Sequence, residues 1–312
     1  MPIVKTDVPM TYALCRQTMD EIVSAYPVCG RRTIGTTAFG RDIDALSIGS
    51  GGRTVLFAAA FHANEWITAT VLLKFAEELS RAITEGGSIY GIPGKLFEYN
   101  CQIFLVPMVD PDGVDLVTGA IPVGSLQWEK AASLSDNYPN IPFPEGWKAN
   151  LLGVDLNLQY PAGWLRAREL KFSQGYTRPG PRDYVGRAPL SQRESRAMAA
   201  FTEYLDPALV LAFHTQGETI YWKYDDIVVP GAQALGQEFA RLSGYALSDT
   251  PYQSSFAGYK DWFIKNWVRP GFTIEAGFGE NPLSIEQFDK IYRDCLGILT
   301  TAALGLPEEE NK

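Results

Sequence analysis

The sequence predicts an α/β fold, in which the strands of a sheet alternate along the chain with helices. Two apolar runs, 54–61 and 208–213, have the composition of strands that are buried on both faces. Segments with apolar residues at helical spacing lie before, between and after these runs. This alternation places the chain in the α/β class.

The remaining elements follow from periodicity and from turn residues. Helices are expected at 11–25, 67–79, 190–204, 232–243 and 285–304. Further strands are expected at 33–37, 42–48, 101–109 and 271–276, the first two forming a hairpin. Stretches rich in glycine and proline predict loops at 86–99, 119–150 and 160–189, and D-P-D-G at 110–113 predicts a turn. Ser191, with Glu194 three positions later, predicts the N-terminal cap of the helix at 190–204.

Length and composition favour one domain that spans residues 1–312. Of the 312 residues, 46% are hydrophobic, which is ample for a core, and no Ser/Gly-rich linker, charge block or repeat divides the chain. The formal net charge of −9 argues against nucleic acid or an anionic membrane as a partner. An anionic substrate would therefore need a local basic patch.

The amino-terminal residues lack the apolar run of a signal peptide, and no apolar stretch reaches the roughly 18 residues of a membrane span. The four cysteines have no C-x-x-C spacing, so a thiolate metal site is not expected, and they are predicted to be reduced and buried. These cysteines are Cys15, Cys29, Cys101 and Cys295. Together these features predict a cytoplasmic protein.

Both histidines of the chain follow a predicted buried strand. His62 comes directly after the run 54–61 and has Glu65 three positions later, while His214 follows the run 208–213. Turns at the carboxyl ends of strands are where open α/β sheets usually bind ligands. Two histidines and one glutamate are a donor set of catalytic zinc sites, which leave the fourth position for water. An H-x-x-E pair alone occurs often by chance, so the prediction requires that the two strands are neighbours in the sheet.

Glu275 is the single charge in the apolar segment F-T-I-E-A-G-F. Burying a carboxylate is costly unless it is paired or bound to something, so one interpretation is a structural ion pair. The other interpretation is a general base beside a metal, because an apolar environment would raise its pKa toward the working pH.

Five motifs, in order, resemble those of the zinc carboxypeptidases, and the resemblance extends through almost the whole chain. The motifs are H-A-N-E-W-I-T, V-D-P-D-G, G-V-D-L-N, A-F-H-T and T-I-E-A-G. The resemblance implies a twisted, mixed and mostly parallel sheet between helices, and hydrolysis of a peptide bond by water that one zinc ion activates. It also implies that His62, Glu65 and His214 bind the zinc, and that Glu275 is the general base and then the proton donor.

Further matches to the family imply roles for residues around the metal. Asp155 corresponds to the carboxylate that orients a zinc-binding histidine, and Asn157 corresponds to a substrate-binding asparagine. Tyr252, in P-Y-Q-S-S, resembles the mobile tyrosine of the family. Lys148 follows Trp147 where the family has W-R, so it could polarise the scissile carbonyl as a point charge without the bidentate fork of arginine.

Departures from the family pattern concern the substrate. Leu158 stands where carboxypeptidases have the arginine that binds the free C-terminal carboxylate, and a leucine cannot make that charge-assisted pair. Asn64 replaces an arginine of the digestive enzymes. Lys260 lies where the family sets its side-chain preference, so it predicts a substrate with a side-chain carboxylate, unless it is a solvated surface lysine. Basic residues of the loop 160–189 could extend this patch, namely Arg166, Arg168, Arg178 and Arg182.

The segments F-H-T-Q-G-E-T-I-Y-W and G-W-K-A-N-x-x-G-V-D-L-N resemble one branch of the family, the γ-D-glutamyl-L-diamino acid peptidases. This resemblance implies cleavage between γ-linked D-glutamate and meso-diaminopimelate in peptidoglycan stem peptides, during murein recycling or remodelling. The partner is then a small peptide, and Lys260 could bind the side-chain carboxylate of its diaminopimelate. The alternatives are a carboxypeptidase for acidic C-terminal residues, a peptide-binding protein without activity and a small-molecule deacylase.

Overall fold

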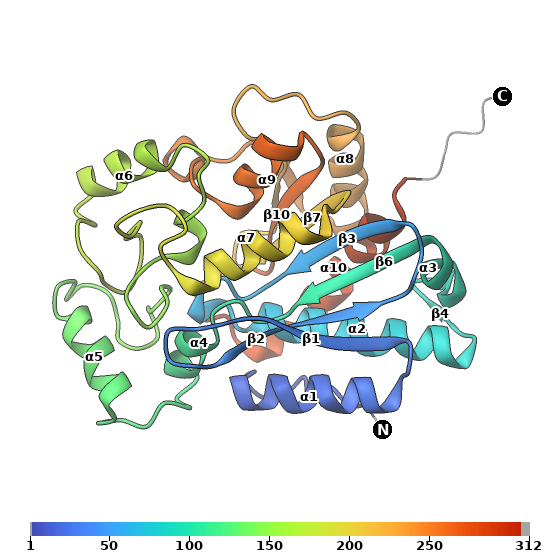
Figure 1. Ribbon diagram of the computed structural model, residues 1–312, viewed down its shortest axis with the longest axis horizontal. Coiled ribbons are helices and arrows are strands. Elements are labelled where there is room, and N and C mark those ends of the chain that lie inside the picture. Colours follow the sequence, from blue (N-terminus) through green and yellow to red (C-terminus); the bar gives the residue numbers. More distant parts are fainter. Residues whose placement is uncertain (1, 307–312) are drawn as a thin grey trace.

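The computed structural model describes residues 2–306, and its centre is an eight-stranded sheet (Figure 1). The strands lie in the order β1-β2-β6-β3-β7-β10-β8-β9 across the sheet. They are β1 (Cys29–Thr36), β2 (Asp42–Ile48), β3 (Arg53–Ala58), β6 (Cys101–Val106), β7 (Leu209–His214), β8 (Thr219–Tyr221), β9 (Ala246–Ser248) and β10 (Gly271–Glu275). The central strands β6, β3, β7 and β10 are parallel, whereas β1 with β2, β2 with β6 and β8 with β10 are antiparallel. The mixed, mostly parallel sheet of an α/β protein is therefore confirmed.

Helices cover both faces of the sheet (Figure 1). On one face α1 (Tyr12–Ala25), α2 (Ile67–Glu85), α8 (Ala232–Ser243) and α10 (Phe288–Leu304) form a layer in which neighbours pack together. On the other face lie α7 (Arg193–Leu205) and α9 (Tyr259–Trp267). The shorter elements are α3 (Gly94–Asn100), α4 (Pro111–Val117), α5 (Leu126–Ser135), α6 (Trp164–Ser173), the hairpin β4 (Ser88–Ile89) and β5 (Ile92–Pro93), and the 3-10 helices η1 (Ala63–Glu65), η2 (Leu156–Leu158), η3 (Tyr252–Ser254) and η4 (Ile285–Gln287).

Strand β3 lies in the middle of the sheet, with β6 on one side and β7 on the other. Its residues Val55, Leu56, Phe57 and Ala58 are each 0% exposed, because helices cover both faces of the strand. Burial on both faces needs a continuous apolar run rather than an alternating one. The apolar signal at 54–61 therefore has a direct structural cause.

Three segments predicted as loops each contain a short regular element, so the predictions are wrong for these parts, although most of 119–150 and 160–189 is irregular as predicted. The segment 86–99 holds β4, β5 and most of α3, the segment 119–150 holds α5, and the segment 160–189 holds α6. The sequence of α6, W-L-R-A-R-E-L-K-F-S, shows the reason, since its apolar residues do not gather on one face. A short helix that packs over loops needs no apolar stripe, and periodicity then gives no signal.

The D-P-D-G segment begins helix α4 instead of forming an isolated turn. Asp110 is the N-cap residue, and its Oδ1 accepts a hydrogen bond from the backbone N–H of Gly113 at 3.1 Å. Pro111 occupies the first helical position, where a missing N–H costs nothing. The residues that predict a turn are here the same ones that begin a helix.

Ser191 does not cap α7, which corrects the prediction from the capping-box spacing. The N-cap residue is Gln192, whose side chain makes no capping hydrogen bond, and Ser191 Oγ donates to Gln159 Oε1 at 2.9 Å. Glu194 is only 1% exposed, and its Oε2 has no partner among the described residues. Burial is the main cause that raises the pKa of Glu194 to about 7, and the charge of Asp112 adds to it.

Replacing Glu194 with glutamine is expected to make the stability of the protein depend less on pH. The pKa is about 7 in the folded state against an ordinary value of 4.5, so the folded protein binds this proton more tightly than the unfolded chain does. This proton therefore adds to the free energy of unfolding. The contribution is complete below the ordinary pKa and is lost as the pH rises through the pKa of the folded state, which lowers the free energy of unfolding by on the order of 1–3 kcal/mol. Urea unfolding at about pH 5 and about pH 8 checks this. Between these two pH values, the free energy of unfolding should fall less in Glu194→Gln than in the wild type.

The matched control is Glu203→Gln, at an exposed position of the same helix. This variant should keep the pH dependence of the wild type. The assignment would be wrong if Glu194→Gln and the wild type lost the same free energy of unfolding over this pH range.

All four cysteines are buried and free, as predicted. Within residues 2–306, no helix combines the length and the apolar character that crossing a membrane requires.

Candidate active site

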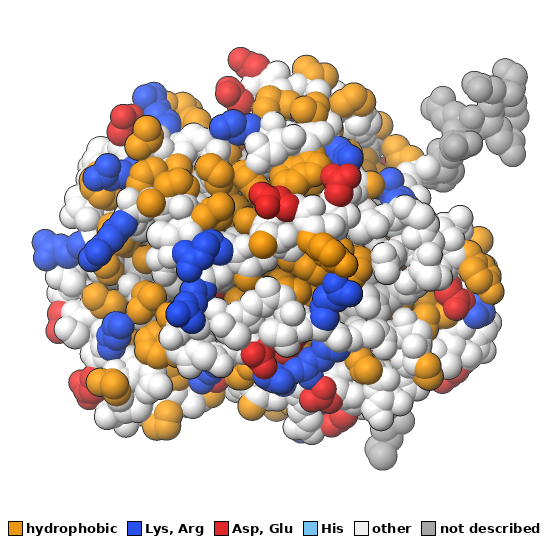
Figure 2. All heavy atoms as spheres, in the orientation of Figure 1, with side chains coloured by type: hydrophobic (Ala, Val, Ile, Leu, Met, Phe, Trp, Pro, Cys, Tyr) orange, Lys and Arg blue, Asp and Glu red, His pale blue; other side chains and the backbone are white. Residues whose placement is uncertain are grey.

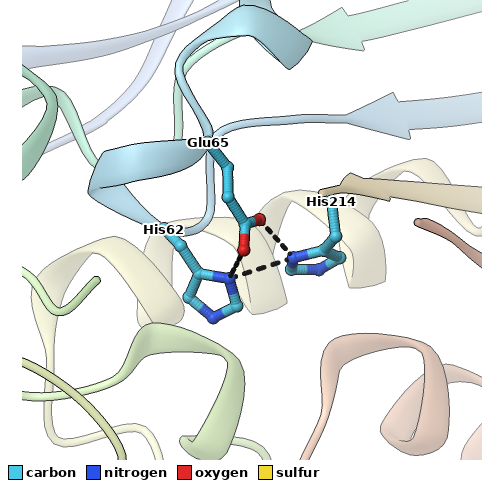
Figure 3. A group of neighbouring side chains, drawn as sticks. All are labelled: His62, Glu65 and His214. Carbon is cyan, nitrogen blue, oxygen red and sulfur yellow. Dashed lines mark hydrogen bonds and ion pairs between the residues drawn. The ribbon is translucent and has the colours of Figure 1, made fainter. Parts of the chain in front are cut away.

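The two histidines meet because their strands are neighbours in the sheet. Strands β3 and β7 pair in parallel, with Ala58 opposite Ala212, so the residues that follow both strands reach the same edge. His62 directly precedes η1 and Glu65 ends it, while His214 is the last residue of β7. Figure 3 shows the two rings and the carboxylate turned toward one another. The neighbouring strands that the metal prediction required are therefore present.

The donor atoms of these three side chains lie at hydrogen-bond distance from one another. His62 Nδ1 lies 3.1 Å from His214 Nδ1, and the two carboxylate oxygens of Glu65 each lie 2.9 Å from one of these nitrogens. All three residues are buried. Although burial opposes ionisation, the two imidazoles hold the pKa of Glu65 below its usual range. Two imidazole nitrogens and an ionised carboxylate are a donor set that fits zinc.

Asp155 fixes the orientation of the His62 ring. Its Oδ1 accepts a hydrogen bond from His62 Nε2 at 3.1 Å, which leaves the lone pair of Nδ1 for the centre of the group. The backbone N–H of Asn157 donates to the same Oδ1 at 3.1 Å, and Lys148 Nζ lies 3.5 Å from Oδ2. Burial opposes the charge of Asp155, but Lys148 and His62 hold its pKa well below the usual range.

Glu275 ends β10 beside this group, because it is in register with His214 across the parallel pair β7 and β10. Its carboxylate pairs with no basic side chain among the described residues, in contrast to Glu65 and Asp155. Burial raises the pKa of Glu275 to about 8, and the charge of Glu65 adds to the shift. A structural ion pair is therefore not what holds this carboxylate in the sheet.

Two cavities meet at the group of donors. The first, of about 280 Å³, extends past Asn157 to Lys260, and the second, of about 660 Å³, extends past Asn64 to Glu280. The residues that line both cavities are Glu65, Lys148, Arg182, Thr215, Tyr221 and Glu275. A peptide could thus lie across the donors with one part in each cavity.

Asn157 and Lys260, which the family resemblance assigns to the substrate, both line the first cavity. Asn157 Nδ2 lies 3.4 Å from His214 Nε2. Lys260 is 4% exposed, and its Nζ lies 2.6 Å from Asp261 Oδ1. Lys260 is therefore not a solvated surface lysine, and its charge is balanced by a neighbouring carboxylate.

Tyr252 lies outside both cavities. It belongs to η3, is 55% exposed, and its Oη accepts a hydrogen bond from Arg166 Nε at 2.8 Å. In this conformation the tyrosine contacts α6 rather than the donors, so contact with a substrate would require it to move.

Of the four basic loop residues, only Arg182 lines either cavity. The other three contact side chains outside the cavities. Arg166 donates to Tyr252, Arg168 lies over the ring of Phe172, and Arg178 donates to Asn137. Lys and Arg side chains also gather at the left of Figure 2, around and below the position of α6 in Figure 1, with a few Asp and Glu side chains among them. The acidic chain thus has a locally basic surface on this side.

Two residues of the first cavity, Lys171 and Asp183, were not predicted from the sequence. Lys171 Nζ lies 2.6 Å from Asp183 Oδ1, and Arg182 Nε donates to Asp183 Oδ2 at 2.7 Å. Lys171 is 8% exposed and Asp183 is 6% exposed, although both types of residue are usually at the surface. No sequence signal marks either residue, because both lie in the segment expected to be a loop.

Comparisons with known proteins agree with this geometry. Residues 15–295 match the zinc carboxypeptidase family. The γ-D-glutamyl-L-diamino acid endopeptidase 1 of Lysinibacillus sphaericus is 43% identical over 290 residues, which cover 92% of this chain and 70% of that protein. Bovine thrombin-activatable fibrinolysis inhibitor, solved with a tick carboxypeptidase inhibitor, has a TM-score of 0.73 at 15% identity over 96% of this chain and 97% of its own. Murein-tripeptide amidase MpaA of Escherichia coli O157 has a TM-score of 0.55 at 18% identity over 90% of this chain and 94% of its own.

The two structural likenesses, at these low identities, show the fold alone. The family match covers most of the chain and includes all three donor residues. The chain therefore belongs to the zinc carboxypeptidase family and is a zinc metallopeptidase.

Proposed function

We propose that the enzyme hydrolyses the amide bond between γ-linked D-glutamate and meso-diaminopimelate in peptidoglycan stem peptides. The proposal rests on the 43% identity, over 92% of this chain, with an endopeptidase named for γ-D-glutamyl-L-diamino acid substrates. Leu158 in the first cavity supports it, because leucine cannot bind the C-terminal carboxylate of an ordinary carboxypeptidase substrate. Murein recycling or remodelling is the proposed role, and the cytoplasm is the proposed location.

The proposed site holds one zinc ion through His62, Glu65 and His214. Bound zinc supplies a Lewis acid for the scissile carbonyl and lowers the pKa of water. Glu275 accepts the proton of the attacking water and passes it to the leaving amine, because its carboxylate lies beside the donors and forms no ion pair among the described residues. Asp155 keeps the His62 ring in the tautomer that presents Nδ1 to the metal.

Lys148 supplies a positive charge beside the reacting groups. It lines both cavities, as Glu275 does, and a cation there stabilises the negative charge that develops on the carbonyl oxygen. Burial opposes this charge, but Asp155 and Asp183 raise the pKa of Lys148, so it stays protonated.

Lys260 and Asp261 form a pair whose chemistry suits diaminopimelate. The far end of the diaminopimelate side chain carries an ammonium and a carboxylate, like a free amino acid. Lys260 and Asp261 both line the first cavity and present the opposite charges side by side. We therefore assign the diaminopimelate residue to the first cavity and the γ-glutamyl residue to the second.

The function is tested by incubating the zinc-loaded protein with L-alanyl-γ-D-glutamyl-meso-diaminopimelate and following the products by mass spectrometry. The expected products are L-alanyl-D-glutamate and free diaminopimelate. An isomer with the ordinary α-linkage at glutamate serves as the control. Intact γ-linked tripeptide after prolonged incubation would refute the proposal.

A second candidate is a carboxypeptidase that removes acidic C-terminal residues. The buried Lys171 and the neighbouring Arg182 favour it, because they place cations in the first cavity although the arginine clamp is replaced by Leu158. Release of C-terminal glutamate from an ordinary peptide, without cleavage of the γ-linked tripeptide, would select this candidate.

Replacing Lys260 with alanine is expected to weaken the preference for diaminopimelate over L-lysine at the same substrate position. L-Lysine lacks the side-chain carboxylate, so the variant should lose roughly tenfold in kcat/KM on the diaminopimelate peptide and little on the lysine peptide. The rate on the lysine peptide also reports that the variant is folded. Lys265→Ala, at an exposed position of the same helix, is the matched control. An unchanged preference would remove Lys260 from substrate recognition.

A further inference from the structure

We propose that Arg182 binds the free α-carboxylate of the γ-linked D-glutamate, on the acyl side of the scissile bond. This inference rests on the proposed function and names the contact by which the enzyme distinguishes a γ-linked acidic residue. Four observations support it, namely the position of Arg182, the freedom of its guanidinium, the local charge and the length of the substrate.

Arg182 lies where the two cavities join. The backbone N–H groups of Lys148 and Ala149 both donate to Pro181 O at 2.8 Å, so the segment that carries Arg182 is tied to the segment that carries Lys148. Arg182 lines both cavities, as Lys148 and Glu275 do. A substrate group bound by Arg182 therefore lies close to the scissile bond.

The Arg182 guanidinium is held at one edge and available at the other. Its Nε donates to Asp183 Oδ2 at 2.7 Å, and Asp183 is itself held by Lys171 at its other oxygen. Neither Nη1 nor Nη2 of Arg182 has a hydrogen-bond partner among the described residues, and the side chain is 43% exposed. Two free NH₂ groups on a fixed plane, each with an N–H for one carboxylate oxygen, are the arrangement that binds a carboxylate bidentately.

The ion pairs around Arg182 leave one positive charge unmatched. Lys148, Lys171 and Arg182 form ion pairs with only two carboxylates among the described residues, those of Asp155 and Asp183. Glu65 and Glu275 also line the two cavities, but neither forms an ion pair with these three cations. Lys260, which also lines the first cavity, is balanced by its ion pair with Asp261. A second substrate anion is therefore expected at Arg182 rather than at Lys260.

The chemistry of a γ-linked glutamate fits this position. Its chain continues through the side-chain carbonyl, so the α-carboxylate stays free and ionised. Only a short run of carbons separates this carboxylate from the scissile carbonyl, so its partner must lie beside the reacting groups. Arg182 meets this condition, whereas Lys260 lines only the first cavity.

The test compares the γ-linked tripeptide with an analogue whose D-glutamate α-carboxylate is amidated. The wild type is expected to prefer the carboxylate by about tenfold to a hundredfold in kcat/KM, as for hydrogen bonds between charged groups. Arg182→Gln should lose this preference, because its loss of kcat/KM should be larger on the carboxylate peptide than on the amidated peptide, and Arg182→Lys should restore part of the preference. Arg168→Gln, an exposed arginine outside both cavities, should behave as the wild type.

Other outcomes overturn the inference. A wild type that cleaves both peptides equally refutes the Arg182 contact but leaves the proposed function intact, whereas a wild type that cleaves neither refutes the function itself. Equal losses on both peptides in Arg182→Gln would show a structural role for this arginine. A third peptide, amidated at the diaminopimelate α-carboxylate, completes the test. If Arg182→Gln loses the preference for a carboxylate over an amide only at the diaminopimelate position, the arginine binds the leaving-group side of the substrate, and the inference is wrong.

Discussion

The Glu275→Gln variant is expected to lose roughly 10²–10⁴ in kcat while it keeps its zinc, because the substitution removes only the general base. Glu275 is not one of the three donors, and glutamine has nearly the same shape as glutamate. The amide cannot accept the proton of the attacking water, so the chemical step slows while the peptide still binds. The measurement is kcat on the γ-linked tripeptide together with the zinc content per chain.

The matched control for this prediction is Glu286→Gln, at an exposed position outside both cavities. It should keep both the zinc and the rate of the wild type. A Glu275→Gln variant that lost zinc in proportion to its activity would make Glu275 a metal-holding residue. A variant with an unchanged kcat would show that another group removes the proton.

The His214→Ala variant is expected to lose both zinc and activity, because it removes one of the two imidazole donors. Treating the wild type with a chelator should abolish turnover, and added zinc should restore it, whereas added zinc should not restore the variant. Zinc binds the folded state, so free zinc at about a thousand times Kd should stabilise the wild type by about 4 kcal/mol. The melting temperature of the variant should not respond to zinc.

Asp155→Asn provides a graded control for the loss of zinc. It leaves all three donors in place but weakens the hydrogen bond that orients His62, so zinc affinity should fall by about 10–100-fold. Excess zinc should therefore restore much of its activity. Full activity of the chelated wild type, or zinc binding by His214→Ala equal to that of the wild type, would contradict the metal assignment.

The sequence predicted best those elements that pack directly on the sheet. The predicted helices at 11–25, 232–243 and 285–304 agree closely with α1, α8 and the segment from η4 to α10. Each of these helices buries one face against the core, and burial of one face produces the apolar periodicity. The helices α5 and α6 lie among loops, where no such pattern is required, and the sequence therefore predicted loops there.

The residues of the site also fall into those that the sequence could predict and those that it could not. His62, Glu65, His214 and Glu275 could be singled out from the sequence because each is a polar residue in or beside a buried apolar run, where a side chain of this kind needs a reason. Lys171 and Arg182 could not be singled out, because a lysine or arginine in a charged, loop-like segment is ordinarily solvated. Their positions depend on how the segment 160–189 folds over the edge of the sheet.

The sequence by itself determined the class of the fold and the types of donor, since continuous apolar runs require a covered sheet and a lone carboxylate within such a run requires a partner. Only the tertiary structure decided that β3, β7 and β10 are neighbours, which brings together His62 and Glu275 from distant parts of the chain. It also decided that Tyr252 lies outside the cavities and that Lys260 is paired with Asp261. The physical reason is that the order of parallel strands is set by how the crossover helices pack, and a local sequence pattern does not contain that information.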